Sequence, residues 1–175
     1  MLLTIKKGRH QDTRPFSSWP HFGRKSMAWQ VTFARDCEYQ LPAYNREDVN
    51  KLFGLSFGLF AVHKNSARFG WRWNPGNERI ELLAYCYIDG KRNWNERLAF
   101  PVVAQIRIGE TVECRLGIHA NGFYYFTVRD TDGKSLGMHL TDKLPDLPRY
   151  GLTHSLYFGG ALPAPHDMHV TMSKL

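Results

Sequence analysis

The sequence predicts an all-β protein built as an antiparallel sandwich of two sheets, with little or no helix. Phe, Tyr and Trp make up 14% of the residues, and aromatic side chains are enriched in strands. Several segments alternate apolar and polar residues with a period of two, which is typical of a strand with one buried face. Asn-Gly or Asp-Gly follows three of these segments, and these dipeptides favour tight hairpin turns.

The first half of the chain contains three strand candidates. Residues 28–35 and 53–62 are rich in apolar and aromatic side chains, and Arg68–Trp73 ends at the turn-forming sequence Asn74-Pro75-Gly76. Only 46–52 looks helical, and it is too short for more than one or two turns. No helical pattern of roughly 10 to 15 residues separates the strands, so a parallel sheet with crossover helices is disfavoured.

The clearest strand is predicted at 78–88. Its wetter face carries Glu81, Tyr85 and Tyr87. Its apolar face consists of Ile80, Leu82, Ala84, Cys86 and Ile88. Asp89-Gly90 follows at once and predicts a tight turn into a returning strand that begins at 91–94.

The second half of the chain repeats this pattern. Strands are expected at 104–108, 111–119, 123–128, 135–138 and 166–174. Asn121-Gly122 and Asp132-Gly133 are expected to form the turns before and after the third of these. Altogether roughly ten to twelve strands are expected, which is enough for two packed sheets.

The length of 175 residues is within the usual range of one domain, and no shift in composition divides the chain. We therefore expect a single domain over 1–175, with 8–26 as an irregular arm because it is rich in Gly, Ser, Pro and basic residues. No stretch reaches the roughly 18 to 20 apolar residues of a membrane span, so no membrane partner is expected. Met1–Lys7 lacks the long apolar region of a signal peptide, and the compartment stays open.

The net charge of +7 raises nucleic acid as a candidate partner. However, Lys and Arg are scattered singly along the chain, apart from a small cluster at Lys6, Lys7 and Arg9. Scattered basic residues are more typical of a solvated surface than of a phosphate-binding stripe, so no nucleic-acid partner is predicted.

Neither a disulfide framework nor a metal site is predicted. Cys37, Cys86 and Cys114 are odd in number and widely spaced, which indicates buried thiols. The histidines lack the spacing of metal ligands. Residues 130–133 begin like a calcium loop but lie where a hairpin turn is needed, so turn chemistry is favoured. No cofactor is expected.

Four segments carry a family resemblance: Ser66–Trp73, Ile80–Tyr87, Tyr157–Gly160 and Ala164–Asp167. They resemble the concanavalin A-like jelly-roll β-sandwich superfamily, especially its small bacterial members of unknown function. The resemblance implies two antiparallel sheets, of which one is concave, with the concave face as the usual carbohydrate site. A fold by itself does not define function.

The side chains opposite the apolar faces of the central strands could line one groove of such a jelly roll. Guanidinium and carboxylate groups hydrogen-bond in fixed geometry, and Tyr adds a stacking surface, so the mixture suits an oligo- or polysaccharide, particularly an acidic one. The alternative is that this face is simply solvated. The candidate ligand-binding residues are Arg68, Arg72, Glu81, Tyr85, Tyr87, Trp94, Arg107, Glu113, Arg115 and His119.

The tryptophans have different expected roles. Trp71 and Trp73 share one face of their strand, opposite Arg68 and Arg72, and are expected in the core. Trp94 follows a turn and is expected at the rim of the binding site.

Catalysis on a polysaccharide is the alternative to binding. Glu81 and Glu113 are the candidate carboxyl pair of a glycosidase, whose two acids lie roughly 5 to 9.5 Å apart. Retaining jelly-roll glycosidases carry Glu-x-Asp-x-x-Glu on one strand, and residues 78–81 do not match it. A lyase would need a base beside an arginine, and residues of these types are Tyr85, His119 and Arg68. We assign no catalytic residue, so binding is favoured over catalysis, and an interaction domain with an aromatic surface is a third hypothesis.

Overall fold

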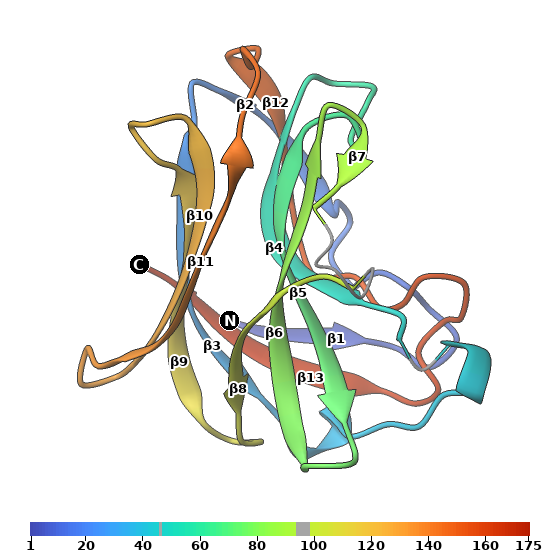
Figure 1. Ribbon diagram of the computed structural model, residues 1–175. Coiled ribbons are helices and arrows are strands. Elements are labelled where there is room, and N and C mark those ends of the chain that lie inside the picture. The colour runs from blue at the N-terminus through green and yellow to red at the C-terminus, as the bar shows by residue number, and fades with distance from the viewer. Residues whose placement is uncertain (46, 94–98) are drawn as a thin grey trace.

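Two antiparallel sheets face each other across an apolar core in the computed structural model of the protein (Figure 1). The structure describes residues 1–45, 47–93 and 99–175. Within them lie thirteen strands and two short 3-10 turns, at Arg35–Cys37 and Ala43–Asn45. The predicted antiparallel two-sheet sandwich with little helix is confirmed.

Sheet A contains six strands. In spatial order they are β1 (Leu2–Ile5), β13 (Met168–Lys174), β3 (Ser26–Phe33), β9 (Thr111–Ile118), β10 (Phe123–Asp130) and β11 (Ser135–Lys143).

Sheet B contains seven strands. In spatial order they are β2 (Ser18–Phe22), β12 (Tyr150–His154), β4 (Asn50–Phe57), β5 (Ser66–Asn74), β6 (Arg79–Ile88) and β7 (Lys91–Arg92), while β8 (Val102–Ile106) also pairs with β6. In Figure 1, β9, β10 and β11 lie at the left, and β4, β5 and β6 lie at the right.

The apolar face predicted from the period-two pattern of the central strands points into the core between the two sheets. On β5, Phe69 and Trp71 are fully buried between the sheets, and Trp71 pairs with Leu82 of β6. Across the core, the rings of Phe69 and Phe126 meet edge to face at a centroid distance of 5.0 Å. Trp73 is partly buried against the same core, so the prediction for both tryptophans is confirmed. The three cysteines are buried free thiols, as predicted.

The glycine-containing turns are also where the sequence places them. Asp89 and Gly90 both adopt left-handed φ angles, 49° and 78°, as a two-residue hairpin between β6 and β7 requires. At the β10–β11 turn, the Asp130 carboxylate accepts hydrogen bonds from the backbone N–H groups of Asp132 and Lys134. This carboxylate therefore stabilises the turn, as the turn interpretation of 130–133 predicts.

Several segments differ from the sequence-based expectation. The strand expected over 53–62 ends at Phe57, where Gly58 takes a left-handed φ of 98°, and the strand expected over 135–138 extends to Lys143. The helical prediction for 46–52 was wrong over Asn50–Leu52, which begin β4, because Asn50 pairs with Trp71 on the neighbouring strand and tertiary pairing overrides a weak local preference. Arg46 lies outside the described residues. Within 8–26, the structure has an edge strand, β2, which pairs with β12; Pro20 is compatible with it because an edge strand leaves one side unpaired.

Candidate functional site

The outer face of sheet B, which points away from the core, brings together five of the predicted ligand-binding residues. Arg68 and Arg72 project from β5, and Glu81, Tyr85 and Tyr87 project from the adjacent strand β6. The strand register places Arg68 directly opposite Tyr85 and Arg72 directly opposite Glu81. We call this surface the outer B face.

The prediction that this face of β6 is the wetter one was wrong. Tyr85 is 9% exposed, Tyr87 6% and Glu81 4%. A second apolar cluster covers them, consisting of Val49, Leu83, Tyr85, Tyr87 and Phe100. The rings of Phe100 and Tyr85 stack at a centroid distance of 4.1 Å. A segment distant in sequence therefore shields a face that local alternation marks as solvated.

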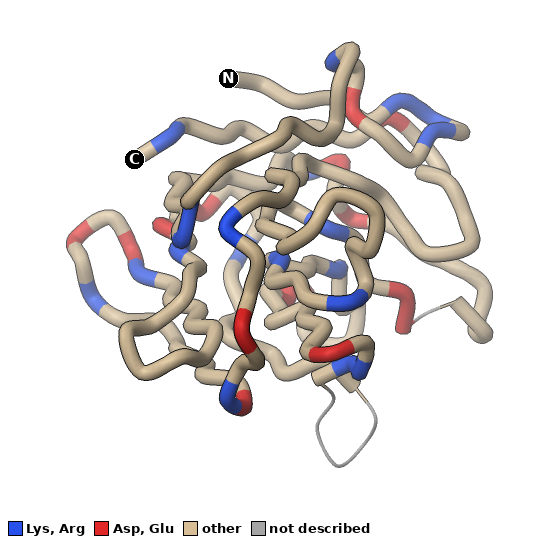
Figure 2. Tube along the Cα trace, turned by 90° about the horizontal axis from the view of Figure 1, so that it is seen from above, with Lys and Arg blue, Asp and Glu red and all other residues tan. Residues whose placement is uncertain are grey.

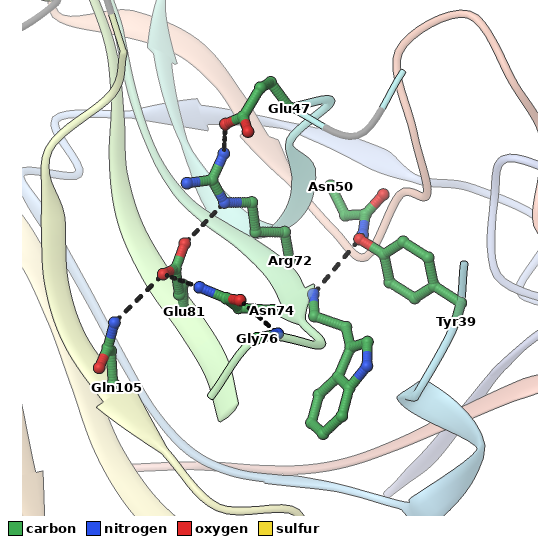
Figure 3. A network of polar contacts seen from close by, with 9 residues as sticks. Tyr39, Glu47, Asn50, Arg72, Asn74, Gly76, Glu81 and Gln105 are labelled. Carbon is green, nitrogen blue, oxygen red and sulfur yellow. Dashed lines mark hydrogen bonds and ion pairs between the residues drawn. The ribbon is translucent and has the colours of Figure 1, made fainter. Parts of the chain in front are cut away.

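At one end of the outer B face, Arg72 and Glu81 form an ion pair in which each side chain balances the charge of the other (Figure 3). The Glu81 carboxylate accepts hydrogen bonds from Arg72 Nε at 2.6 Å, Asn74 Nδ2 at 2.8 Å and Gln105 Nε2 at 3.1 Å. Arg72 also forms an ion pair with Glu47. Burial opposes ionisation of Glu81, but the hydrogen bonds from Asn74, Arg72 and Gln105 outweigh it and lower its pKa. This end is a closed polar network.

Arg68 lies on the same strand and face, but its surroundings are different. It is 8% exposed, and its Nε and Nη2 atoms are buried without a hydrogen-bond partner among the described residues. Its guanidinium carbon lies 4.7 Å from the centre of the Tyr85 ring. Burial lowers the pKa of Arg68, opposed by the nearby Tyr85, Tyr87 and Cys86 side chains.

Lys51 of β4 completes this group, although it is not among the residues predicted from the sequence. Its Nζ atom lies 4.9 Å from the centre of the Tyr85 ring and donates a 3.0 Å hydrogen bond to the carbonyl oxygen of Gly159. Burial and then Arg68 lower the pKa of Lys51 to about 8. Alternation along β4 could not have found it, because strict alternation puts Lys51 on the face of the core residue Phe53, and a register shift between these two residues turns Lys51 outward.

Two histidines border the same group. His154 of β12 lies within hydrogen-bond distance of Ser56 Oγ at 2.9 Å and of Ser18 Oγ at 3.1 Å. Burial, followed by Arg68, lowers the pKa of His154 to about 4, so this ring is neutral at pH 7. The His63 ring stacks on Tyr87 at 4.8 Å, and burial followed by Arg68 lowers its pKa as well.

The structure does not bring the remaining predicted residues to this face. Glu113 and Arg115 project from the outer face of sheet A, and His119 stacks on Phe123 beside the β9–β10 turn. Arg107 follows β8 in an exposed turn closed by Glu110. Trp94 lies outside the described residues.

The proposed glycosidase pair is contradicted by this placement. Glu81 and Glu113 project outward from opposite sheets, and packed sheets alone are about 10 Å apart. Glu81 is also held by its own network, so the two carboxyls cannot flank one glycosidic bond.

A cavity of about 320 Å³ lies at an edge of the sandwich and was not anticipated from the sequence. Trp19 and His154 from sheet B and Trp29 from sheet A contribute to its lining. Trp19 lies on β2 and is 57% exposed, so it offers a second aromatic surface. It was missed because 8–26 was expected to be irregular.

Lys and Arg are distributed over the whole trace rather than along one stripe (Figure 2). Across the described ranges, no cluster of three His, Cys, Asp or Glu side chains could hold a metal ion. None of the helical segments among these residues is long and apolar enough to cross a membrane.

Comparison with known proteins places the fold. No family model matches the sequence, and no curated protein is similar to it. The CBM2 module of the evolved Dit protein of Lactobacillus casei phage J-1 is similar in structure, with a TM-score of 0.51 and 11% identity over 98% of this chain and 75% of that one. An endo-β-1,4-glucuronan lyase from the fungus Trichoderma reesei has a TM-score of 0.49 and 12% identity, over 99% and 77% of the two chains. Lectin I-B4 from Griffonia simplicifolia has a TM-score of 0.35 and 14% identity, over 99% and 87%.

At these identities the likeness concerns the fold alone. The likeness to the CBM2 module agrees with the two-sheet β-sandwich architecture, and the chemistry of the site has to be argued from this chain's own residues.

Proposed function

We propose that this protein binds a saccharide on the outer B face, at Arg68 and Tyr85. The observation that carries the proposal is the buried Arg68 guanidinium, which has two nitrogens without an acceptor among the described residues. A buried donor without a partner costs about 1–3 kcal/mol. A ligand that supplies the missing acceptors would explain why an arginine occupies this position. The hydroxyl and ring oxygens of a sugar can accept such hydrogen bonds.

The neighbouring side chains suit a sugar ring. Tyr157 supplies partly exposed aromatic surface, with Lys51 Nζ 5.5 Å from its ring centre, while the buried Tyr85 ring contacts both Arg68 and Lys51. An amphipathic ring with a polar rim matches the apolar faces and hydroxyl edges of a pyranose. The scattered distribution of basic residues does not favour a nucleic-acid backbone as the ligand.

A glycan array followed by titration calorimetry tests this proposal. Arg68→Met is expected to weaken binding of the selected saccharide at least tenfold, because it removes the unpaired donors. Arg115→Met is the matched control: it removes the same charge from the outer face of sheet A and is expected to leave affinity unchanged. Absence of any saccharide ligand, or equal affinities of the two variants, would contradict the proposal. Loss of binding in Trp19→Ala but not in Arg68→Met would move the site to the edge cavity.

A second candidate function, uronate β-elimination, is favoured by one observation. Lys51 lies beside Arg68, and its pKa of about 8 leaves part of the amine unprotonated near neutral pH. A neutral amine could take the proton from C5 of a uronate while Arg68 neutralises the carboxylate. The C4–O bond would then break with its electron pair leaving on the oxygen, which takes a proton from water, and a C4=C5 double bond remains.

This second candidate is tested by ultraviolet absorbance of the unsaturated product. A lyase would release product with wild-type protein and none with Lys51→Met. Binding of a uronate oligosaccharide without any product would exclude the lyase and leave the binding function in place.

A further inference from the structure

The charges around Arg68 indicate which class of saccharide this face would bind. Arg68 and Lys51 approach the same Tyr85 ring, at 4.7 Å and 4.9 Å from its centre. Since Phe100 stacks on this ring, one ring face is covered by another side chain. The two distances to the ring centre together limit the separation of Arg68 Cζ and Lys51 Nζ to at most about 10 Å. Like charges this close repel each other in a partly buried site.

Further basic groups border the same position. Arg92 donates a 2.9 Å hydrogen bond from Nε to the Tyr87 hydroxyl. The positive charges of Arg68, Lys51 and Arg92 all act to lower the pKa of His63. For Lys51, Asp48 acts in the opposite direction, but burial and the neighbouring arginines outweigh it. Among the residues that the structure describes, the charges acting on Lys51 and His63 therefore sum to a positive field.

Arg72 provides an internal comparison. It lies four residues along the same strand and on the same face, and it forms ion pairs with Glu47 and Glu81. Arg68 has no ion pair with any described residue, although it is the more deeply buried of the two arginines. Burying a charge without a counter-ion is costly, so an external anion would relieve both the missing hydrogen bonds and the repulsion with Lys51.

We propose that the saccharide bound on the outer B face is anionic, and that its carboxylate or sulfate ester binds between Arg68 and Lys51. This inference rests on the proposed saccharide-binding function and specifies its ligand. The planar guanidinium can donate two parallel hydrogen bonds to such an oxyanion, and the Lys51 ammonium adds a point charge beside it. The sugar ring would then extend toward the partly exposed Tyr157 ring, which lies 5.5 Å from Lys51 Nζ.

The test compares neutral and acidic oligosaccharides of the same linkage. Suitable pairs are β-1,4-linked glucose with β-1,4-linked glucuronate and β-1,4-linked mannose with β-1,4-linked mannuronate, with a sulfated β-1,4-glucan as a third arm. An acidic member is expected to bind at least tenfold more tightly than its neutral counterpart, with affinity falling as salt rises. The uronate and sulfate arms distinguish the two kinds of oxyanion.

The outcomes separate this inference from the function on which it rests. Equal affinity for neutral and acidic members would overturn the inference while saccharide binding remains. Binding to none of the saccharides would overturn both. If Arg68→Met does not fold, Arg68→Lys keeps the charge but loses the planar fork; it is expected to keep the preference for acidic members at lower affinity.

Proton linkage provides a second readout. An oxyanion beside Lys51 favours its protonated form, so binding at pH 8 is expected to take up protons, measured by calorimetry in buffers of different ionisation enthalpy. Lys51→Met is expected to abolish this uptake, whereas Lys143→Met, an exposed substitution on β11, is expected to retain it. Uptake that persists in Lys51→Met would place the anion elsewhere.

Discussion

Replacing Arg68 by Met is expected to make the protein more stable, although it changes a nearly fully buried residue. The substitution removes the cation–π contact with Tyr85, worth about 1–2 kcal/mol. It also removes two buried donors without partners, each of which costs about 1–3 kcal/mol. Met retains much of the apolar stem, so we expect a net gain of about 2 kcal/mol in the free energy of unfolding.

The gain is large enough to measure. For a chain of this length, 1 kcal/mol corresponds to about 2–4 °C in Tm, so the variant should melt roughly 6 °C higher. Urea denaturation without ligand, followed by fluorescence, would give the free energy directly. The matched control is Arg72→Met on the same strand, which leaves the buried Glu81 carboxylate without its ion-pair partner. This control is expected to lose about 3 kcal/mol.

The opposite signs of these two effects are the essential result. If Arg68→Met destabilises the protein by 1 kcal/mol or more, as Arg72→Met should, then Arg68 contributes to stability in the unliganded protein. Its missing partners would no longer indicate a ligand, and the argument for saccharide binding at this position would be refuted. A stabilised variant that also loses saccharide binding would show that Arg68 is retained for function at a cost in stability.

Three further predictions concern Lys51, Glu81 and Gly54. The pKa of Lys51 falls from 10.5 to about 8 on folding, so between these pH values the unfolded chain binds more protons than the folded protein. The free energy of unfolding of the wild type should therefore increase as pH rises from 8 to 10.5. Lys51→Met should lack this increase in urea titrations at the two pH values. Folding lowers the pKa of Glu81, so the ionised carboxylate stabilises the folded protein above its unfolded pKa, and this stabilisation is lost as the carboxylate is protonated in acid. Glu81→Gln should lower the free energy of unfolding by about 2 kcal/mol at pH 7. An equal loss in acid would contradict this account. Gly54→Ala should lower the free energy of unfolding by about 3 kcal/mol, because the added Cβ would lie 2.3 Å from the backbone oxygen of Ala67. A Tm equal to that of the wild type would show that β4 and β5 can separate at this position.

The sequence by itself determined most of the central strands and which of their residues point into the core, but not β2 or the start of β4. The period-two pattern is local, and a residue such as Trp71 or Cys86 carries it regardless of which strand lies beside it. The hairpin turns are equally local, since Asp89-Gly90 needs only its own left-handed backbone. The two-sheet antiparallel sandwich follows from these elements and the absence of long helices.

The tertiary structure decided which outward-facing residues meet. Local alternation marks both Glu81 and Glu113 as outward, but it does not specify which sheet each one belongs to, and they lie on opposite sides of the sandwich. Arg68 and Arg72 look alike in the sequence, yet only Arg72 lies within reach of Glu47 and Glu81. Lys51 reaches Arg68 because β4 pairs with β5. Strand pairing and side-chain coverage are non-local, which is why the outer B face could be anticipated only in part.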